Sequence, residues 1–196
     1  MIGQDVPARV HEGEVVRVWD HAGLQLRETE ETLYLSVYEY RFDLAADPGF
    51  VAAVRVARAE EVLRLLVTDN VQLAREHRAF RSRNGYPDDG PVEQGVLSTT
   101  VERTAARVTL FWEGFELAVS LGNLAPPIFI TGTHPRDRGV GVYGCVREAS
   151  SGTAVLNGEP VRGSVFANEV YTPWLGRPLS SAALGLGETL IRLPNG

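Results

Sequence analysis

Acidic side chains next to apolar, strand-like segments are the first candidates for chemistry in this chain. Glu169 and Asp69 occupy such positions, as do Glu39 and Glu116. Burial raises the pKa of a carboxyl group and fits it for proton transfer near neutral pH. The simpler interpretation of each acid is a solvated charge at a strand edge. We expect Glu169 first and Asp69 second to protonate an alkene or polarise a carbonyl, with Tyr171 donating a hydrogen bond.

Aromatic residues form a second group of candidates, because they can line a pocket and still present a hydroxyl or N–H group. In the strand-like segment LYLSVYEYRFD, alternation places three tyrosines on one face and three aliphatic residues on the other. A strand that is apolar on both faces is typical of one covered on both sides. The alternative role of each aromatic is a plain core or rim position. The residues predicted to bind substrate are Tyr34, Tyr38, Tyr40, Trp112, Tyr143 and Trp174, of which Tyr38 or Tyr143 could also take the donor role.

Motifs for cofactor or metal chemistry are missing from the sequence. It contains no G-x-S-x-G, no H-E-x-x-H and no paired-histidine metal spacing. The segment GVGVYG follows no strand–helix pattern, so it does not predict a dinucleotide site. All 19 basic residues are arginine, which excludes Schiff-base chemistry and a P-loop lysine. We therefore expect no cofactor.

The histidines give no sign of a metal site. His11, His21, His77 and His134 are far apart in sequence and stand near polar or turn-forming residues. Three of them could meet in space, but this placement favours four surface histidines over a three-histidine metal site.

Composition and charge limit the number of domains and the kinds of partner that the protein can have. The 196 residues are 44% hydrophobic and 22% charged, which suits one domain over residues 1–196. The net charge of −6 argues against a nucleic-acid partner. No apolar run is long enough to span a membrane, and the N-terminus lacks a secretory apolar region. The single cysteine, Cys145, excludes an internal disulfide and suits a small buried apolar residue. We expect a cytoplasmic protein.

The dominant structural signal is β. The segment LQLRETEETLYLSVYEYRFD predicts two strands around a charged turn at residues 28–31. Residues 47–66 permit a helix or a hairpin, and their β surroundings favour the hairpin. Residues 76–95 predict a polar loop, and Asn157-Gly158 predicts a turn between two strands. The C-terminal segment 179–196 could form a short helix or a final hairpin around residues 185–188.

The stretch FELAVSLGNLAPPIFITG indicates how the strands are arranged. Pro126 and Pro127 cannot donate ladder hydrogen bonds, so they should end a strand and bend the chain at a barrel rim. Leu124, Ile128 and Phe129 would then lie at the barrel mouth. Many short strands at near-regular spacing predict an all-β fold. We expect a lipocalin-like antiparallel β-barrel or a closely related sandwich, with at most one or two short helices.

From Phe115 onward, the order of features resembles the lipocalin-like family related to carotenoid 1,2-hydratase (hydroxyneurosporene synthase) and to AttH-type proteins. The matching segments are LAVSLGNLAPPI, GVGVYG, SSGTAVLNGEPVRGSVF, ANEVYTPW and ALGLGETLIRLPNG. The resemblance covers about the last 80 residues and makes Glu169 the favoured acid. It implies two barrel-like domains side by side, and this chain has room for one, so we expect a homodimer.

The acidic motif of that family is only partly present. The positions of its pattern, roughly Asp-x-Glu-Trp, are occupied here by Asn168, Glu169, Val170 and Tyr171. In that alignment neither acid is kept, and in one shifted by a single residue Glu169 is the only acid retained. The hydratase chemistry of the family therefore cannot be transferred on this basis.

These observations together predict a function. We expect a cofactor-independent cyclase or isomerase, Diels-Alderase-like or hydratase-like. Its substrate would be a hydrophobic biosynthetic intermediate, such as a polyketide or terpenoid, bound in a barrel pocket. The alternatives are a non-catalytic carrier of lipophilic small molecules, which needs the pocket but no acid, and a structural module with a packed core.

Overall fold

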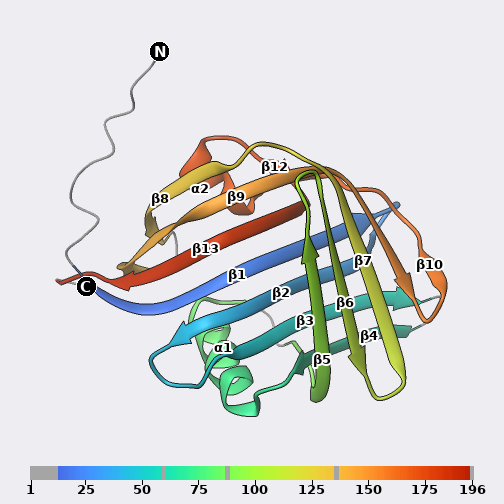
Figure 1. Cartoon of the computed structure of the whole chain (residues 1–196), viewed down its shortest axis with the longest axis horizontal. Helices are drawn as coiled ribbons and strands as arrows, with labels where there is room; N and C mark the ends of the chain where they lie inside the picture. The colour runs from blue at the N-terminus through green and yellow to red at the C-terminus, as the bar shows by residue number, and fades with distance from the viewer. Residues whose placement is uncertain (1–12, 59–60, 87–88, 135–136, 195–196) are drawn as a thin grey trace.

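The computed structural model describes residues 13–58, 61–86, 89–134 and 137–194 (Figure 1). Strands dominate these residues, with two α-helices and one 3-10 turn among them. The strands are β1 (Glu14–Arg27), β2 (Glu31–Asp43), β3 (Gly49–Arg58), β4 (Glu61–Thr68), β5 (Val92–Val101), β6 (Ala105–Trp112), β7 (Phe115–Leu124), β8 (Ile128–His134), β9 (Asp137–Leu156), β10 (Glu159–Val161), β11 (Ala167–Asn168), β12 (Leu179–Ser180) and β13 (Ala182–Arg192). The helical elements are α1 (Val71–Arg83), η1 (Glu169–Tyr171) and α2 (Thr172–Leu175).

The main sheet closes on itself. Its order, β9–β13–β1–β2–β3–β4–β5–β6–β7, returns to β9 because β7 also pairs with β9. All neighbours in this ring are antiparallel except β4 and β5, which are parallel and are joined through α1. A parallel pair needs such a crossover connection. The predicted all-β barrel with at most two short helices is confirmed.

The long strand β9 belongs to two parts of the molecule. Its first half pairs with β8 and β13, and its second half pairs with β7 and β10. β7 and β8 therefore run along one edge of β9 as a single interrupted strand, with Leu124 opposite Ala149 and Ile128 opposite Val146. The break falls at residues 125–127, as the two prolines predict. Beside the break, Phe129 is 78% exposed, whereas Leu124 is buried.

Two separate hydrophobic cores use opposite faces of the same strands. The barrel interior holds aliphatic residues from all nine ring strands, including Leu33, Leu35 and Val37 of β2. In Figure 1, β5, β6 and β7 cross in front of β1–β4 and enclose this core. The opposite face of β13–β1–β2–β3–β4 carries a second core that contains Tyr40 and is covered by α1, β8 and the η1–α2 segment. The prediction that β2 is covered on both sides is confirmed.

The expectation of a polar loop over residues 76–95 is wrong. Helix α1 continues to Arg83, and the side chain of Asn70 caps its start by accepting a hydrogen bond from the backbone N–H of Leu73. The helix has few apolar residues, but Leu73, Ala74, His77 and Arg81 recur along one side and are buried. The hairpin expected within residues 47–66 is present as β3 and β4, with the tip at residues 59–60 outside the described residues.

The C-terminal segment forms neither of the expected alternatives. β13 is one continuous strand with a register shift between Leu186 and Thr189. The Asn157-Gly158 turn does join β9 to β10 as predicted, with φ angles of +52° and +83°. No helix in the described part of the chain is long and apolar enough to cross a membrane.

Candidate active site

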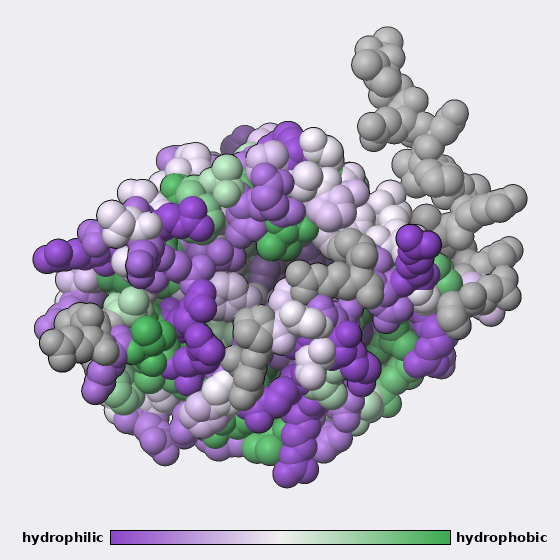
Figure 2. Space-filling model, turned by 180° about the vertical axis from the view of Figure 1, so that it is seen from behind, coloured by the Kyte–Doolittle hydropathy of each residue, from purple (hydrophilic) through white to green (hydrophobic). Residues whose placement is uncertain are grey.

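Two adjoining cavities lie on the outer face of the barrel sheet, beneath its helical cover. Their volumes are about 230 Å³ and about 110 Å³, and both are lined by His21, Tyr38, Arg81 and Tyr171. The barrel interior is filled by its own core, which is mainly aliphatic. The pocket expected inside the barrel therefore lies on the second face of β1, β2 and β13. The molecular face in Figure 2 is mostly hydrophilic, with small separated hydrophobic groups and a hollow near its centre.

Glu188 is the acidic group of the smaller cavity. Its side chain is 7% exposed, and the indole Nε1 of Trp19 donates to its Oε2 at 2.6 Å. The hydroxyl of Tyr171 donates to its Oε1 at 3.2 Å. Burial raises the pKa of Glu188 to about 7, although both hydrogen bonds act in the opposite direction. This carboxyl group can exchange a proton near neutral pH.

The bulge in β13 makes room for the Glu188 side chain. Gly187 has a φ of +59°, and its N–H donates to the carboxylate of Asp20 at 2.8 Å. A Cβ on Gly185 would lie 2.7 Å from Glu188 Oε1, and a Cβ on Gly144 would lie 3.0 Å from its Cγ. Glycine at both positions lets the carboxyl group turn inward between strands.

A chain of polar contacts extends from Glu188 across the larger cavity. The Tyr171 hydroxyl lies 3.5 Å from Nδ1 of His21, and Nε2 of His21 lies 2.9 Å from Oγ of Ser36. Burial lowers the pKa of His21 to about 4 and raises that of Tyr171 well above its usual range. His21 and Tyr171 are therefore neutral at pH 7, and Glu188 is the group in this chain of contacts that changes charge near that pH.

A second histidine reaches the site from helix α1. His77 is 2% exposed, and its Nδ1 lies 2.7 Å from the hydroxyl of Tyr40. Burial, reinforced by Arg81 and Arg17, lowers the pKa of His77 to about 3. The Tyr38 ring lies between the two histidines, with its centroid 4.8 Å from that of His21 and 4.8 Å from that of His77.

The expectation of four surface histidines is wrong for those that the structure describes. His21, His77 and His134 all line the smaller cavity, and His134 is 9% exposed. His11 lies outside the described residues. Within the described ranges, no group of three histidine, cysteine or acidic side chains could hold a metal ion. Cys145, expected to be buried, is half-buried.

Arginines give the larger cavity a polar end. Arg81 is buried, forms an ion pair with Asp89 at 2.7 Å, and lies 3.4 Å from the hydroxyl of Tyr34. Arg55 and Arg64 also line this cavity. The smaller cavity is more aromatic and aliphatic, with Trp19, Phe80, Ile130, Trp174 and Leu190 in its wall. The combined site suits a molecule with an apolar body and a polar end.

Five of the predicted site residues meet here. Tyr34 lines the larger cavity, Tyr40 and Trp174 line the smaller one, and Tyr38 and Tyr171 line both.

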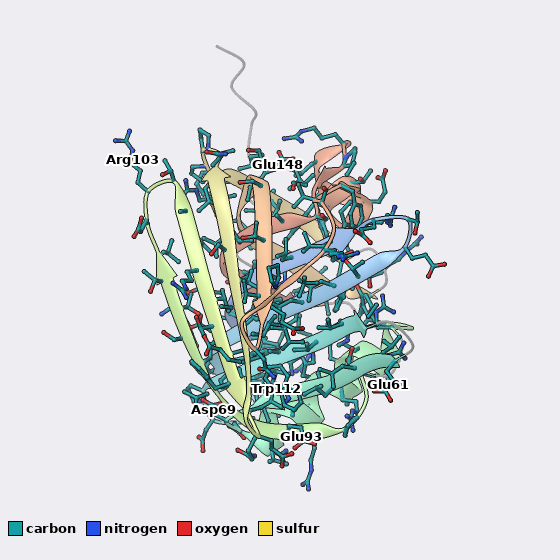
Figure 3. All side chains as sticks on the ribbon, turned by 90° about the vertical axis from the view of Figure 1, so that its right-hand side faces the viewer. Glu61, Asp69, Glu93, Arg103, Trp112 and Glu148 are labelled. Carbon is teal, nitrogen blue, oxygen red and sulfur yellow. The ribbon has the colours of Figure 1, made fainter. Side chains whose placement is uncertain are left out.

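The other four predicted site residues lie elsewhere. Glu169 is exposed and bonds to the Thr172 hydroxyl, and Asp69 is exposed and accepts from the N–H of Phe50. Both acids therefore match the simpler interpretation, a solvated charge, and neither is the buried acid that the catalytic role requires. Trp112 packs in the barrel core. Figure 3 shows Trp112 and Asp69 at one end of the β5–β7 layer and Arg103 at the other end. Tyr143 is 41% exposed and lines neither cavity.

Three functional candidates escaped the sequence interpretation: Glu188, His21 and His77. A signal for Glu188 was present, because it is the single acid in the apolar segment ALGLGETLIRL and would share a strand face with Leu190. A signal for His77 was its helical spacing from Leu73 and Arg81. Nothing in the sequence around His21 distinguishes it from a strand-edge histidine.

Comparisons with known proteins add little to this geometry. No protein-family profile matches the chain, and no curated protein matches it significantly. Two solved acetoacetate decarboxylase structures show a distant similarity. One, from Legionella pneumophila subsp. pneumophila str. Philadelphia 1, has a TM-score of 0.35 and 10% identity over 92% of this chain and 84% of that one. The other has a TM-score of 0.35 and 11% identity over 91% and 85% of the two chains.

Proposed function

We propose that this chain is a cofactor-independent isomerase or cyclase that moves a proton on a hydrophobic small molecule, with Glu188 as the acid–base group. The observation that carries the proposal is the position of this carboxyl group. It is buried in the wall of an aromatic cavity, held by Trp19 and Tyr171, and connected through Tyr171 to His21. Glu188 thus takes the role that the sequence assigned to Glu169.

Proton transfer in an isomerisation balances without a further reactant. The carboxylate of Glu188 removes a proton from one carbon of the substrate, and the resulting carboxyl group returns it to another carbon. A pKa of about 7 favours both halves of this cycle near neutral pH. Tyr171 and Trp19 stabilise the carboxylate before the first step and after the second. In a cyclisation the order is reversed: the Glu188 carboxyl group donates its proton to the substrate, the folded chain closes its ring, and the carboxylate takes a proton back from the cyclised cation.

The walls of the two cavities indicate the kind of substrate. The aromatic residues Trp19, Tyr38, Tyr40 and Trp174 suit a flat or polyene-like body, and the arginine end suits an oxygen-rich terminus. A polyketide or terpenoid intermediate has both features. The resemblance of the last 80 residues to a hydratase family supports a substrate of this class, and membership of that family remains a proposal.

A deuterium-incorporation experiment tests the proposal and does not require the natural substrate. The purified protein is incubated in D₂O with a panel of ketones, enones and polyenes, and mass spectrometry follows deuterium uptake at carbon. We expect uptake with one or more compounds and a loss of about 10²-fold or more in Glu188→Gln. Glu169→Gln is the matched control, because Glu169 is an exposed acid near the same site, and it should keep the wild-type rate.

A lipophilic carrier is the alternative, and the cavity itself favours it equally. A carrier needs the aromatic walls but not the buried acid. Native mass spectrometry that finds the same co-purified molecule on wild type and Glu188→Gln, together with no deuterium uptake by either, would establish the carrier instead.

A further inference from the structure

A row of polar side chains crosses the sheet at one end of the larger cavity. Each member is opposite the next in strand register, from β1 through β2 and β3 to β4, and the members are Gln25, Tyr34, Arg55 and Arg64. Residues directly opposite each other in antiparallel strands have their side chains on the same face of the sheet. All four line the cavity of about 230 Å³, so they form one polar wall, called here the arginine row.

The arginine row carries a positive charge that its surroundings do not neutralise. Arg55 forms an ion pair with Glu31, whereas the exposed guanidinium group of Arg64 has no ion pair or hydrogen bond within the described part of the chain. Like charges directly opposite each other on two strands are destabilising. An anion between Arg55 and Arg64 would relieve this repulsion and accept charge-assisted hydrogen bonds from both side chains.

The hydroxyl of Tyr34 lies close to this arginine pair and to a third arginine. The guanidinium carbon of Arg55 is 5.9 Å from the centroid of the Tyr34 ring, and Nη1 of Arg81 is 3.4 Å from the Tyr34 hydroxyl. Asp89 balances the charge of Arg81 through contacts at 2.7 Å and 2.9 Å. The side chain of Arg55 is 38% exposed, so a ligand can reach this end of the cavity from solvent.

Strand register also relates the arginine row to the proposed acid. Glu188 is opposite Trp19, which is opposite Tyr40, and Tyr40 lies six residues along β2 from Tyr34. At about 3.3 Å per residue, the two positions are roughly 20 Å apart along the strand, less what the long side chains at both ends span. Tyr38, which lines both cavities, lies between them. A molecule that contacts both ends must therefore be long, with its apolar body along the sheet.

We propose that the arginine row binds the carboxylate of a long-chain acid, whose apolar body brings a carbon remote from that carboxylate to Glu188; this assignment of substrate class rests on the proposed acid–base function. Arg55 and Arg64 donate to the carboxylate oxygens, and the Tyr34 hydroxyl adds a further donor. The carboxylate takes no part in the proton transfer at this distance. It fixes the register of the chain, and so selects which carbon meets the acid.

Two probes with the same body and different head groups test the proposal. cis-Parinaric acid is a long-chain acid whose conjugated tetraene fluoresces in an apolar site, and the corresponding primary alcohol carries no charge. In fluorescence titrations at pH 8 and low salt, we expect the wild-type protein to bind the acid about 10-fold or more tightly than the alcohol. Raising the salt from about 20 mM to about 500 mM should weaken binding of the acid but not of the alcohol, because the arginines are solvent-accessible.

Variants of the unpaired arginine give the second part of the test. Arg64→Gln should weaken acid binding about 10-fold and leave alcohol binding unchanged, and Arg64→Glu should abolish the preference for the acid. Arg107→Gln is the matched control, because it changes the net charge equally at another exposed strand arginine. Arg107 belongs to β6 and lines neither cavity, so this variant should bind both probes like wild type.

Equal wild-type affinity for acid and alcohol, or no binding of the acid up to its solubility limit, overturns the proposal. Equal losses of acid binding in Arg64→Gln and Arg107→Gln overturn it as well, because the effect would then come from overall charge. If these tests fail while Glu188→Gln still loses deuterium uptake, the substrate class is wrong and the proposed function survives. If the acid binds through Arg64 while neither wild type nor Glu188→Gln takes up deuterium, the carboxylate site stands and the proposed function fails.

Discussion

Removing the titrating group at Glu188 should change how the stability of the protein depends on pH. The pKa of Glu188 is about 7 in the folded chain, against 4.5 for the free group. Between these values the folded protein holds a proton that the unfolded chain has released. Glu188 therefore contributes stability that is fully present below about pH 4.5 and is lost as pH rises through about 7. At about 1.4 kcal/mol per pKa unit, the full loss is about 3.5 kcal/mol, of which about 2.5 kcal/mol falls between pH 5 and pH 8.

The measurement compares wild type with Glu188→Gln by urea denaturation at several values between pH 5 and pH 8. The difference in unfolding free energy, wild type minus variant, should fall by about 2.5 kcal/mol across this range. Glutamine does not titrate, so any constant cost of the substitution cancels from the slope. Glu169→Gln is the control for replacing a glutamate by glutamine at an exposed position. A flat difference for Glu188→Gln would refute the assignment of a buried, proton-exchanging carboxyl group.

Three further predictions concern other parts of the fold. His77→Asn should make the protein less sensitive to acid. Because the pKa of His77 is about 3 in the folded chain against 6.5 for the free group, His77 lowers the unfolding free energy of wild type by about 2 kcal/mol between pH 8 and pH 5. The variant should lack this loss, which urea denaturation at both pH values measures. Trp112→Ala should lower the unfolding free energy by about 3–5 kcal/mol, because it opens a cavity in the barrel core, and the folded fraction should keep the wild-type rate of deuterium uptake. Asn70→Ala should cost about 1 kcal/mol through the loss of the α1 cap, and an unchanged denaturation midpoint would contradict that role.

The sequence predicts the strands well because their side-chain alternation is local. Even and odd positions of one strand lie on opposite faces, which distinguishes Tyr34, Tyr38 and Tyr40 from Leu33 and Leu35. The structure places the two sets in different cores. The Asn157-Gly158 turn and the two-proline break follow from backbone conformations that few other residues adopt. Such features do not depend on distant parts of the chain.

The site residues depend on pairings that the sequence does not encode locally. Glu188 is buried because a bulge turns it toward Trp19, a residue 169 positions earlier. His77 is buried because α1, whose composition is polar, covers the second face of the sheet. Aromatic neighbours in the sequence favour Glu169 as the acid, but η1 directs it outward to Thr172. Burial of a charged or polar residue is set by tertiary contacts, so residue type and spacing alone could not assign the acid.

The position of β13 has a consequence for how the chain folds. β13 lies between β1 and β9, so the second edge of β1 is paired only when β13, the last described strand, has been made. Contacts across such a sequence separation carry a large loop-closure entropy and are typical of slow-folding proteins. During synthesis, β1–β4 can pair in order as they emerge, but the free edge of β1 stays open to intermolecular pairing until residues 182–192 arrive. Glu188 is part of that strand, so the acid reaches the cavity only in the step that closes the barrel.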